Sequence, residues 1–128
     1  MSSTPSPIPT TLVTGASARA REAAIAADLG RPGLGATGSH AVILEGLPSG
    51  SSPLDAAPEH VHVARIAPGC LCCTGNLVLR VTLNRMLRLR PERLTIGVAD
   101  SGHLDQLRSW LESAPYDQLL RLTPDLSA

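Results

Sequence analysis

PTTLVTG, residues Pro9–Gly15, is a short β-prone run that ends in a glycine. An Ala-rich segment follows and closes at Leu29, with Gly30 and Pro32 as stop signals. Alanine has the highest helix propensity, so this segment is expected to be helical. A strand, a glycine turn and a helix form the opening unit of many α/β domains. The start of the chain therefore predicts an α/β fold.

The rest of the chain continues this alternation. Gly46 to Pro58 is rich in Gly, Ser and Pro and predicts a long surface loop. Residues 1–8 are expected to be a flexible leader, and residues 9–128 a single α/β domain with a mostly parallel sheet flanked by helices. The further expected elements are strands at Ala41–Glu45, His60–Ile66, Leu94–Val98 and Leu119–Thr123, and helices at Leu77–Leu89 and His103–Leu111. In the helix at Leu77–Leu89 the apolar positions are Leu79, Leu83, Met86, Leu87 and Leu89, and Arg80, Arg85 and Arg88 are expected to point largely outward.

Composition limits the function classes. The 128 residues carry a formal net charge of zero, so nothing indicates a nucleic-acid surface. The chain contains no run of 18 apolar residues, so a membrane-spanning helix is not expected. The N-terminal residues lack the pattern of a signal peptide. Clustered cysteines without an export signal favour a reducing cytoplasm, and metal or redox use over structural disulfides.

GCLCC, residues Gly69–Cys73, contains every cysteine of the chain. Cys70, Cys72 and Cys73 follow a strand-like run and precede the strongest helical pattern, for which Asn76 is a plausible N-cap. Thiolates are good ligands for Zn²⁺, and a helix N-terminus lowers thiol pKa values. The pattern favours a metal site, with a redox centre and three inert buried thiols as alternatives. Candidates for a fourth ligand are His40, His60, His62 and His103.

Gly15 stands where a phosphate-binding loop would begin. A Walker A loop needs a second glycine, a lysine and a Ser or Thr at fixed spacing. Counted from Gly15, those positions hold Ala20, Arg21 and Glu22, and the chain contains no lysine. Gly15 and Arg21 are the candidate remnants of a nucleotide site. A glutamate at position 22 is also expected if this residue lies in the first turn of the helix, where the helix dipole favours a carboxylate.

These features together resemble the CobW-like family of P-loop GTPases, the metallochaperone-related proteins of cobalt and zinc handling. Gly69-Cys70-Leu71-Cys72-Cys73 resembles the family's G-C-x-C-C motif, and Thr74–Leu77 open the following helix as in the family. Ile8–Gly15 is similar to the family's first strand and turn, and Arg90–Ile96 is also family-like.

The resemblance implies a truncated P-loop NTPase-like fold in which Cys70, Cys72 and Cys73 bind zinc or cobalt. The chain departs from the family at the Walker A positions. It also lacks the guanine-specificity motif, which requires lysine, and we do not expect the family's C-terminal domain. After Ile96 the family has an acidic and small polar residues before Gly-x-Ala-Asp, whereas here Gly97–Asp100 follows directly.

We therefore expect a cytoplasmic, metal-binding accessory protein with a degenerate nucleotide site. Its partners would be a metal ion and a protein client or a second copy of the chain. Enzyme activity is left open, and GTP hydrolysis is not expected. The alternatives are a residual GTP-binding protein that uses Mg²⁺, and a thiol redox protein.

Overall fold

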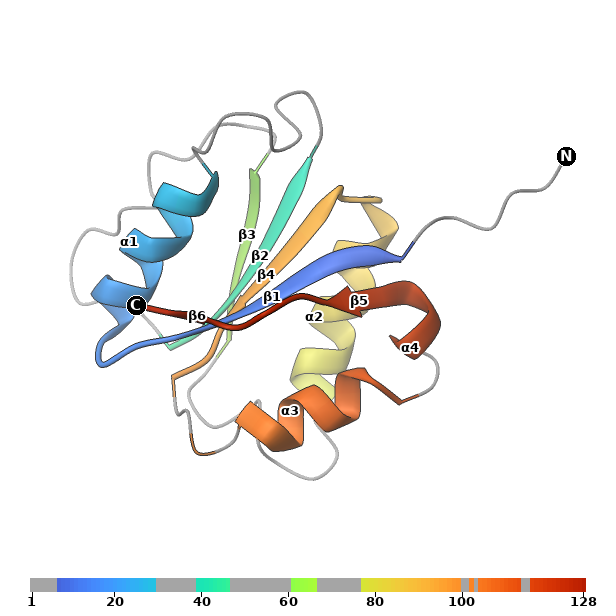
Figure 1. Ribbon diagram of the computed structural model, residues 1–128. Helices are drawn as coiled ribbons and strands as arrows, with labels where there is room; N and C mark the ends of the chain where they lie inside the picture. Colours follow the sequence, from blue (N-terminus) through green and yellow to red (C-terminus); the bar gives the residue numbers. More distant parts are fainter. Residues whose placement is uncertain are drawn as a thin grey trace, which may run out of the picture.

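The computed structural model describes residues 7–29, 39–46, 61–66, 77–99, 102, 104–113 and 116–128. Most of the predicted leader and long loop lies outside these ranges. The elements, in chain order, are β1 (Ile8–Thr14), α1 (Ala18–Leu29), β2 (His40–Glu45), β3 (Val61–Ile66), α2 (Leu77–Arg88), β4 (Arg93–Gly97), α3 (Leu104–Leu111), α4 (Tyr116–Leu119), β5 (Leu120–Leu122) and β6 (Leu126–Ser127) (Figure 1).

The strands form one sheet in the order β3-β2-β4-β1-β5, with β6 also paired to β1. Every pairing among the described strands is parallel. The predicted α/β class with a mostly parallel sheet flanked by helices is confirmed, and the architecture is compatible with a P-loop-like fold. The short helix α4 and the two-residue strand β6 were not expected, and β1 already begins at Ile8, inside the predicted leader.

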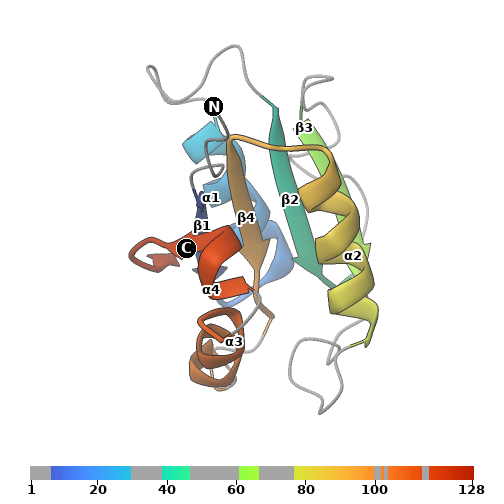
Figure 2. The ribbon, with the colours of Figure 1, turned by 90° about the vertical axis from the view of Figure 1, so that its right-hand side faces the viewer.

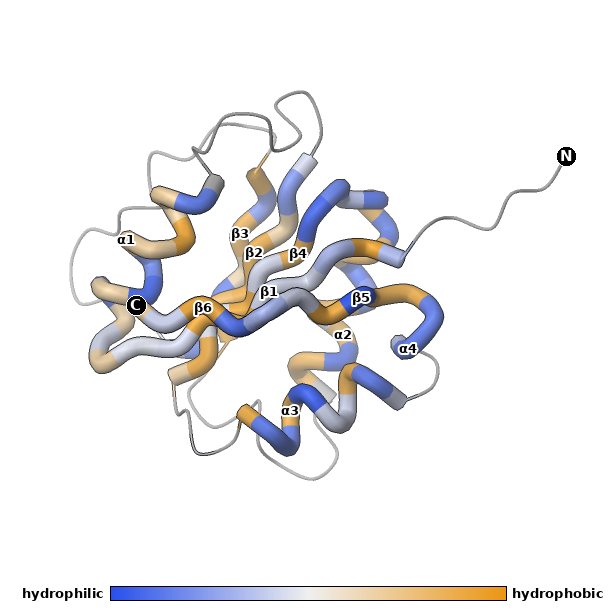
Figure 3. The backbone as a smooth tube through the Cα atoms, in the orientation of Figure 1, coloured by the Kyte–Doolittle hydropathy of each residue, from blue (hydrophilic) through white to orange (hydrophobic). Residues whose placement is uncertain are grey.

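Helices cover both faces of the sheet, with α1 on one side and α2 and α3 on the other (Figures 1 and 2). Neighbouring strand residues point to opposite faces, so Leu12 and Ile43 join the α2 side while Val13 and Val42 join the α1 side. Apolar residues predominate along β2, whose residues are all buried, as a strand covered on both faces requires, whereas β3 is largely half-buried (Figure 3).

Helix α2 buries one stripe of side chains against the sheet. Leu79, Leu83 and Met86 are buried, as the helical spacing predicts. Leu89 was wrongly predicted to join them, because the helix ends at Arg88 and leaves the Leu89 side chain 46% exposed. Arg80, Arg85 and Arg88 are exposed, as expected.

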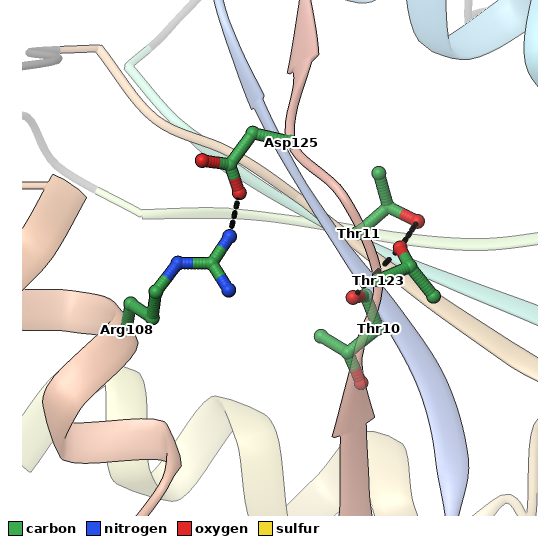
Figure 4. A network of polar contacts seen from close by, with 5 residues as sticks. All are labelled: Thr10, Thr11, Arg108, Thr123 and Asp125. Carbon is green, nitrogen blue, oxygen red and sulfur yellow. Dashed lines mark hydrogen bonds and ion pairs between the residues drawn. The ribbon is translucent and has the colours of Figure 1, made fainter.

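The last strands are tied to β1 by threonines. The Thr123 amide donates to the Thr10 carbonyl at 2.8 Å, and the Thr11 and Thr123 hydroxyls are 2.7 Å apart (Figure 4). Arg108 of α3 also pairs with Asp125, which lies between β5 and β6 (Figure 4). These contacts hold the segment after β5 along β1. No helix among the described residues is long and apolar enough to cross a membrane.

Candidate functional site

The carboxyl ends of β1, β2, β3 and β4 meet at one edge of the sheet, because the four strands are parallel. Ligands of open α/β sheets bind at this edge. Thr14, Glu45, Ile66 and Gly97 are the last residues of these strands. Both predicted sites start here, since Gly15 follows β1 and the cysteine segment follows β3.

Cys70, Cys72 and Cys73 lie outside the described residues, as does Asn76. The elements on either side of them are described, and they are the predicted strand, β3, and the predicted helix, α2. The chain therefore enters the cysteine segment from the carboxyl end of β3 and leaves it at the N-terminus of α2. Within the described part of the chain, no three His, Asp or Glu side chains gather as a metal site would require.

The described candidates for a fourth ligand lie toward the opposite end of the sheet. His40 is the first residue of β2, and its side chain is 2% exposed. His62 is the second residue of β3 and pairs in register with Ala41. Three residues lie between His62 and Ile66, so the two Cα atoms are about 13 Å apart along the strand. Neither histidine lies at the edge from which the cysteine segment starts. His60 and His103 are outside the described residues.

The turn at Gly15 is closely packed. A Cβ atom at Gly15 would lie 2.8 Å from the Ala128 Cβ and 3.1 Å from the Arg21 Cγ. The Ala128 amide also donates to the Thr14 carbonyl at 2.7 Å. Ser17 caps α1, because its Oγ accepts from the Ala20 amide at 3.1 Å. Glycine is thus required at position 15 by the close approach of its neighbours.

Arg21 folds back onto this turn. Its guanidinium donates to the Gly15 carbonyl at 2.9 Å, and the residue is 6% exposed. The structure therefore brings the two predicted phosphate-loop residues together. The contact itself is an internal one, between the cation of Arg21 and a backbone carbonyl of the turn.

Glu22 has a partner that the sequence analysis did not identify. Both of its carboxylate oxygens accept hydrogen bonds from the Arg65 guanidinium, each at 3.1 Å. The Glu22 side chain is 3% exposed, and the Arg65 side chain 20%. Glu22 is not in the first helical turn, since α1 begins at Ala18. The dipole explanation for Glu22 was wrong, and the ion pair with β3 accounts for this buried carboxylate.

Glu45 is a second buried carboxylate at the same edge. Its Oε1 accepts from the Ala99 amide at 2.8 Å and links the end of β2 to the residues after β4. The register sets Glu45 directly beside Ile66. Gly46 follows with a φ of 101°, and its amide donates to the Ile66 carbonyl at 2.8 Å. The sequence signal that could have identified Glu45 was its position as the one carboxylate at the end of an otherwise apolar run.

One curated relative is similar to part of the chain. It is the zinc chaperone YeiR of Escherichia coli (strain K12), a member of the CobW family, and it is 36% identical over 62 residues. The match covers 48% of this chain and 19% of YeiR, so the chain spans about a fifth of the length of the relative. This likeness fits the predicted CobW resemblance loosely. No protein-family model matches the chain, and no solved structure matches it significantly.

Proposed function

We propose that this protein binds and carries a divalent metal ion, zinc or cobalt, through the thiolates of Cys70, Cys72 and Cys73. The observation that carries the proposal is the position of the cysteine segment in the chain. It starts at the carboxyl end of β3, where α/β sheets hold their ligands, and ends at the N-terminus of the twelve-residue helix α2. A helix N-terminus stabilises thiolates, which are the metal-binding form of cysteine.

The similarity to a zinc chaperone supports zinc as the ion. Three thiolates alone leave the fourth tetrahedral position of zinc free for water or for a group of a client protein. An open position suits an ion that is cargo, because an incoming ligand can bind the ion before the chain releases it. The positions of His40 and His62, far along their strands from this edge, are consistent with such an open site.

We propose that the Gly15 turn does not bind nucleotide. A Walker A lysine must be free to reach phosphates, whereas Arg21 is bonded to the Gly15 carbonyl and Glu22 to Arg65. Titration with GTP and Mg²⁺ tests this assignment. Binding at micromolar concentrations would overturn it and would favour the residual GTP-binding alternative.

Elemental analysis tests the proposed metal site. The protein is purified under reducing, chelator-free conditions, supplied with Zn²⁺ or Co²⁺, and compared with a variant in which all three cysteines are serine. We expect close to one ion per chain in the wild type and none in the triple variant. His62→Ala is the matched control, and it should keep the metal.

Equal metal content in the wild type and the triple variant would contradict the proposal. The redox alternative gives a different result. In that case the protein would lack metal and would form a reversible disulfide between Cys70 and Cys72.

A further inference from the structure

A groove runs between β3 and α2, at a distance from the edge that the proposed metal site occupies. It has a volume of ≈ 440 Å³ and is lined by residues 61–64 of β3 and by Thr82, Arg85, Met86 and Leu89 of α2. Among the described strands, β3 is the last strand on this side of the sheet and pairs only with β2 (Figure 2). Within the described part of the chain, no strand pairs with the backbone N–H and C=O groups of its second edge, the groups to which an added strand would bind.

Strand β3 carries no charge that would repel an added strand. Natural edge strands are often protected by charged side chains or by proline. The sequence of β3, VHVARI, contains one charged residue, Arg65, and no proline. Arg65 points to the α1 side, where Glu22 binds it through both carboxylate oxygens. The ion pair thus directs the Arg65 charge away from the groove, whereas His62 lines the groove.

The helical wall of the groove is both apolar and basic. Val78 is 48% exposed and Leu89 is 46% exposed, and the helical spacing sets both on the flank that includes Arg85. Residues 77–90 contain four arginines and no acidic residue. The formal net charge of the chain is zero, so this positive surface is balanced by acidic residues elsewhere.

We propose that this groove binds an extended, acidic segment of a partner protein. The segment adds a strand to the open edge of β3. On the face toward α2, an apolar side chain enters the groove, and a Glu or Asp two residues along the segment meets Arg85. Addition of a strand to a sheet edge derives affinity from backbone hydrogen bonds and specificity from alternate side chains. A second copy of this chain is a poorer occupant, because a symmetric contact would bring Arg85 against its own counterpart.

The proposal does not depend on the cysteine site, and its test uses the 128-residue chain with all three cysteines replaced by serine. The probe is a fluorescein-labelled peptide that repeats valine-serine-glutamate-serine, which sets valine and glutamate on the same face of a strand. Its binding is followed by fluorescence anisotropy. Peptides that repeat valine-serine-lysine-serine and serine-serine-glutamate-serine are the composition controls. We expect saturable binding of the valine-serine-glutamate-serine peptide only.

Charge reversal then locates the site. Arg85→Glu should weaken binding about tenfold, since a charge at the rim of the groove would become repulsive. Arg80→Glu is the matched control, because it makes the same change on the opposite flank of α2 and should alter the affinity less than about twofold. Equal weakening by both variants would overturn the proposed location.

A peptide N-methylated at every second residue tests strand addition without changing the protein. It cannot form the backbone ladder along one of its edges, so we expect binding to fall about tenfold when that edge faces β3. Two such peptides are compared, one methylated along each edge. Strand addition would be overturned if both bound as tightly as the unmethylated peptide.

Sedimentation of the protein alone tests whether a second copy of the chain occupies the groove. If the protein sediments as a dimer and Leu89→Glu converts it to a monomer, the proposal is also overturned, because the groove then holds a second copy.

Discussion

Arg65 of β3 and Glu22 of α1 form a two-point ion pair on the face of the sheet opposite α2, with both N–O distances at 3.1 Å. Glu22 stands where a Walker A loop carries Ser or Thr. Its carboxylate joins the first helix to the strand that leads to the cysteines. The residue that departs most from the phosphate-loop pattern therefore has a structural role.

Removal of Arg65 alone should destabilise the fold strongly. Arg65→Met removes the guanidinium that binds both oxygens of the buried Glu22 carboxylate, which costs about 3 kcal/mol. Urea unfolding, followed by the fluorescence of Trp110, measures the loss. The double variant Glu22→Leu with Arg65→Met should recover most of the stability, because an apolar pair of similar volume replaces the buried charges. A double variant as unstable as Arg65→Met would contradict this account of the pair.

Gly15→Ala should lower the free energy of unfolding by about 1–2 kcal/mol. The added Cβ would lie 2.8 Å from the Ala128 Cβ and 3.1 Å from the Arg21 Cγ. Thermal and urea unfolding measure the effect. In the background of Ala128→Gly, which removes the closer of the two contacts, the cost of Gly15→Ala should be smaller. An identical cost in both backgrounds would mean that Ala128 does not explain the need for glycine.

Arg90→Gly should stabilise the protein. Arg90 follows the end of α2 with a φ of 51°, a left-handed conformation that glycine adopts without strain. Relief of this strain is worth up to about 1 kcal/mol. Arg90→Ala is the matched control, since it removes the same charge and keeps the Cβ. Stabilisation of equal size by both variants would point to charge removal instead of backbone strain.

Tyr116 should titrate above the usual range. Burial raises its pKa from the ordinary value of about 10, with Arg80 partly offsetting the effect. The Tyr116 hydroxyl lies 3.1 Å from the Asn84 Oδ1, to which it donates. A raised pKa means that the folded chain holds the phenol proton more tightly than the unfolded chain. This stabilisation is complete below about pH 10 and is lost as the pH rises through the folded-state pKa.

Near-ultraviolet absorbance measures this titration directly, because the chain has one tyrosine. The native midpoint should lie above that of the unfolded protein. Tyr116→Phe should abolish the corresponding step in stability at alkaline pH. Coinciding native and unfolded midpoints would contradict the effect of burial.

The hydrophobic pattern alone predicted much of the fold. Continuous apolar runs such as Ala41–Glu45 identified the buried strands, and the spacing of Leu79, Leu83 and Met86 identified the buried stripe of α2. The two-residue strand β6 was missed because it is too short to show a period. Its placement comes from pairing with β1, a contact between residues more than a hundred positions apart.

The candidate site was less predictable, because its described contacts are between distant residues. Nothing in the neighbourhood of Glu22 indicated Arg65, which is 43 positions away. Nor could the sequence indicate that Glu45 would accept a hydrogen bond from Ala99. Local sequence predicted the strand and the helix on either side of the cysteines, and the residue types of Cys70, Cys72 and Cys73 supplied the metal hypothesis.

X-ray absorption spectroscopy of the zinc-loaded protein tests the central claim most directly, because it identifies the atoms bound to the ion. The account predicts three sulfur ligands at about 2.3 Å, completed by one lighter ligand at about 2.0–2.2 Å. Replacement of Cys70, Cys72 or Cys73 by serine should remove one sulfur each time. A spectrum of nitrogen and oxygen ligands alone, or one unchanged by the three replacements, would contradict the claim that these cysteines hold the metal.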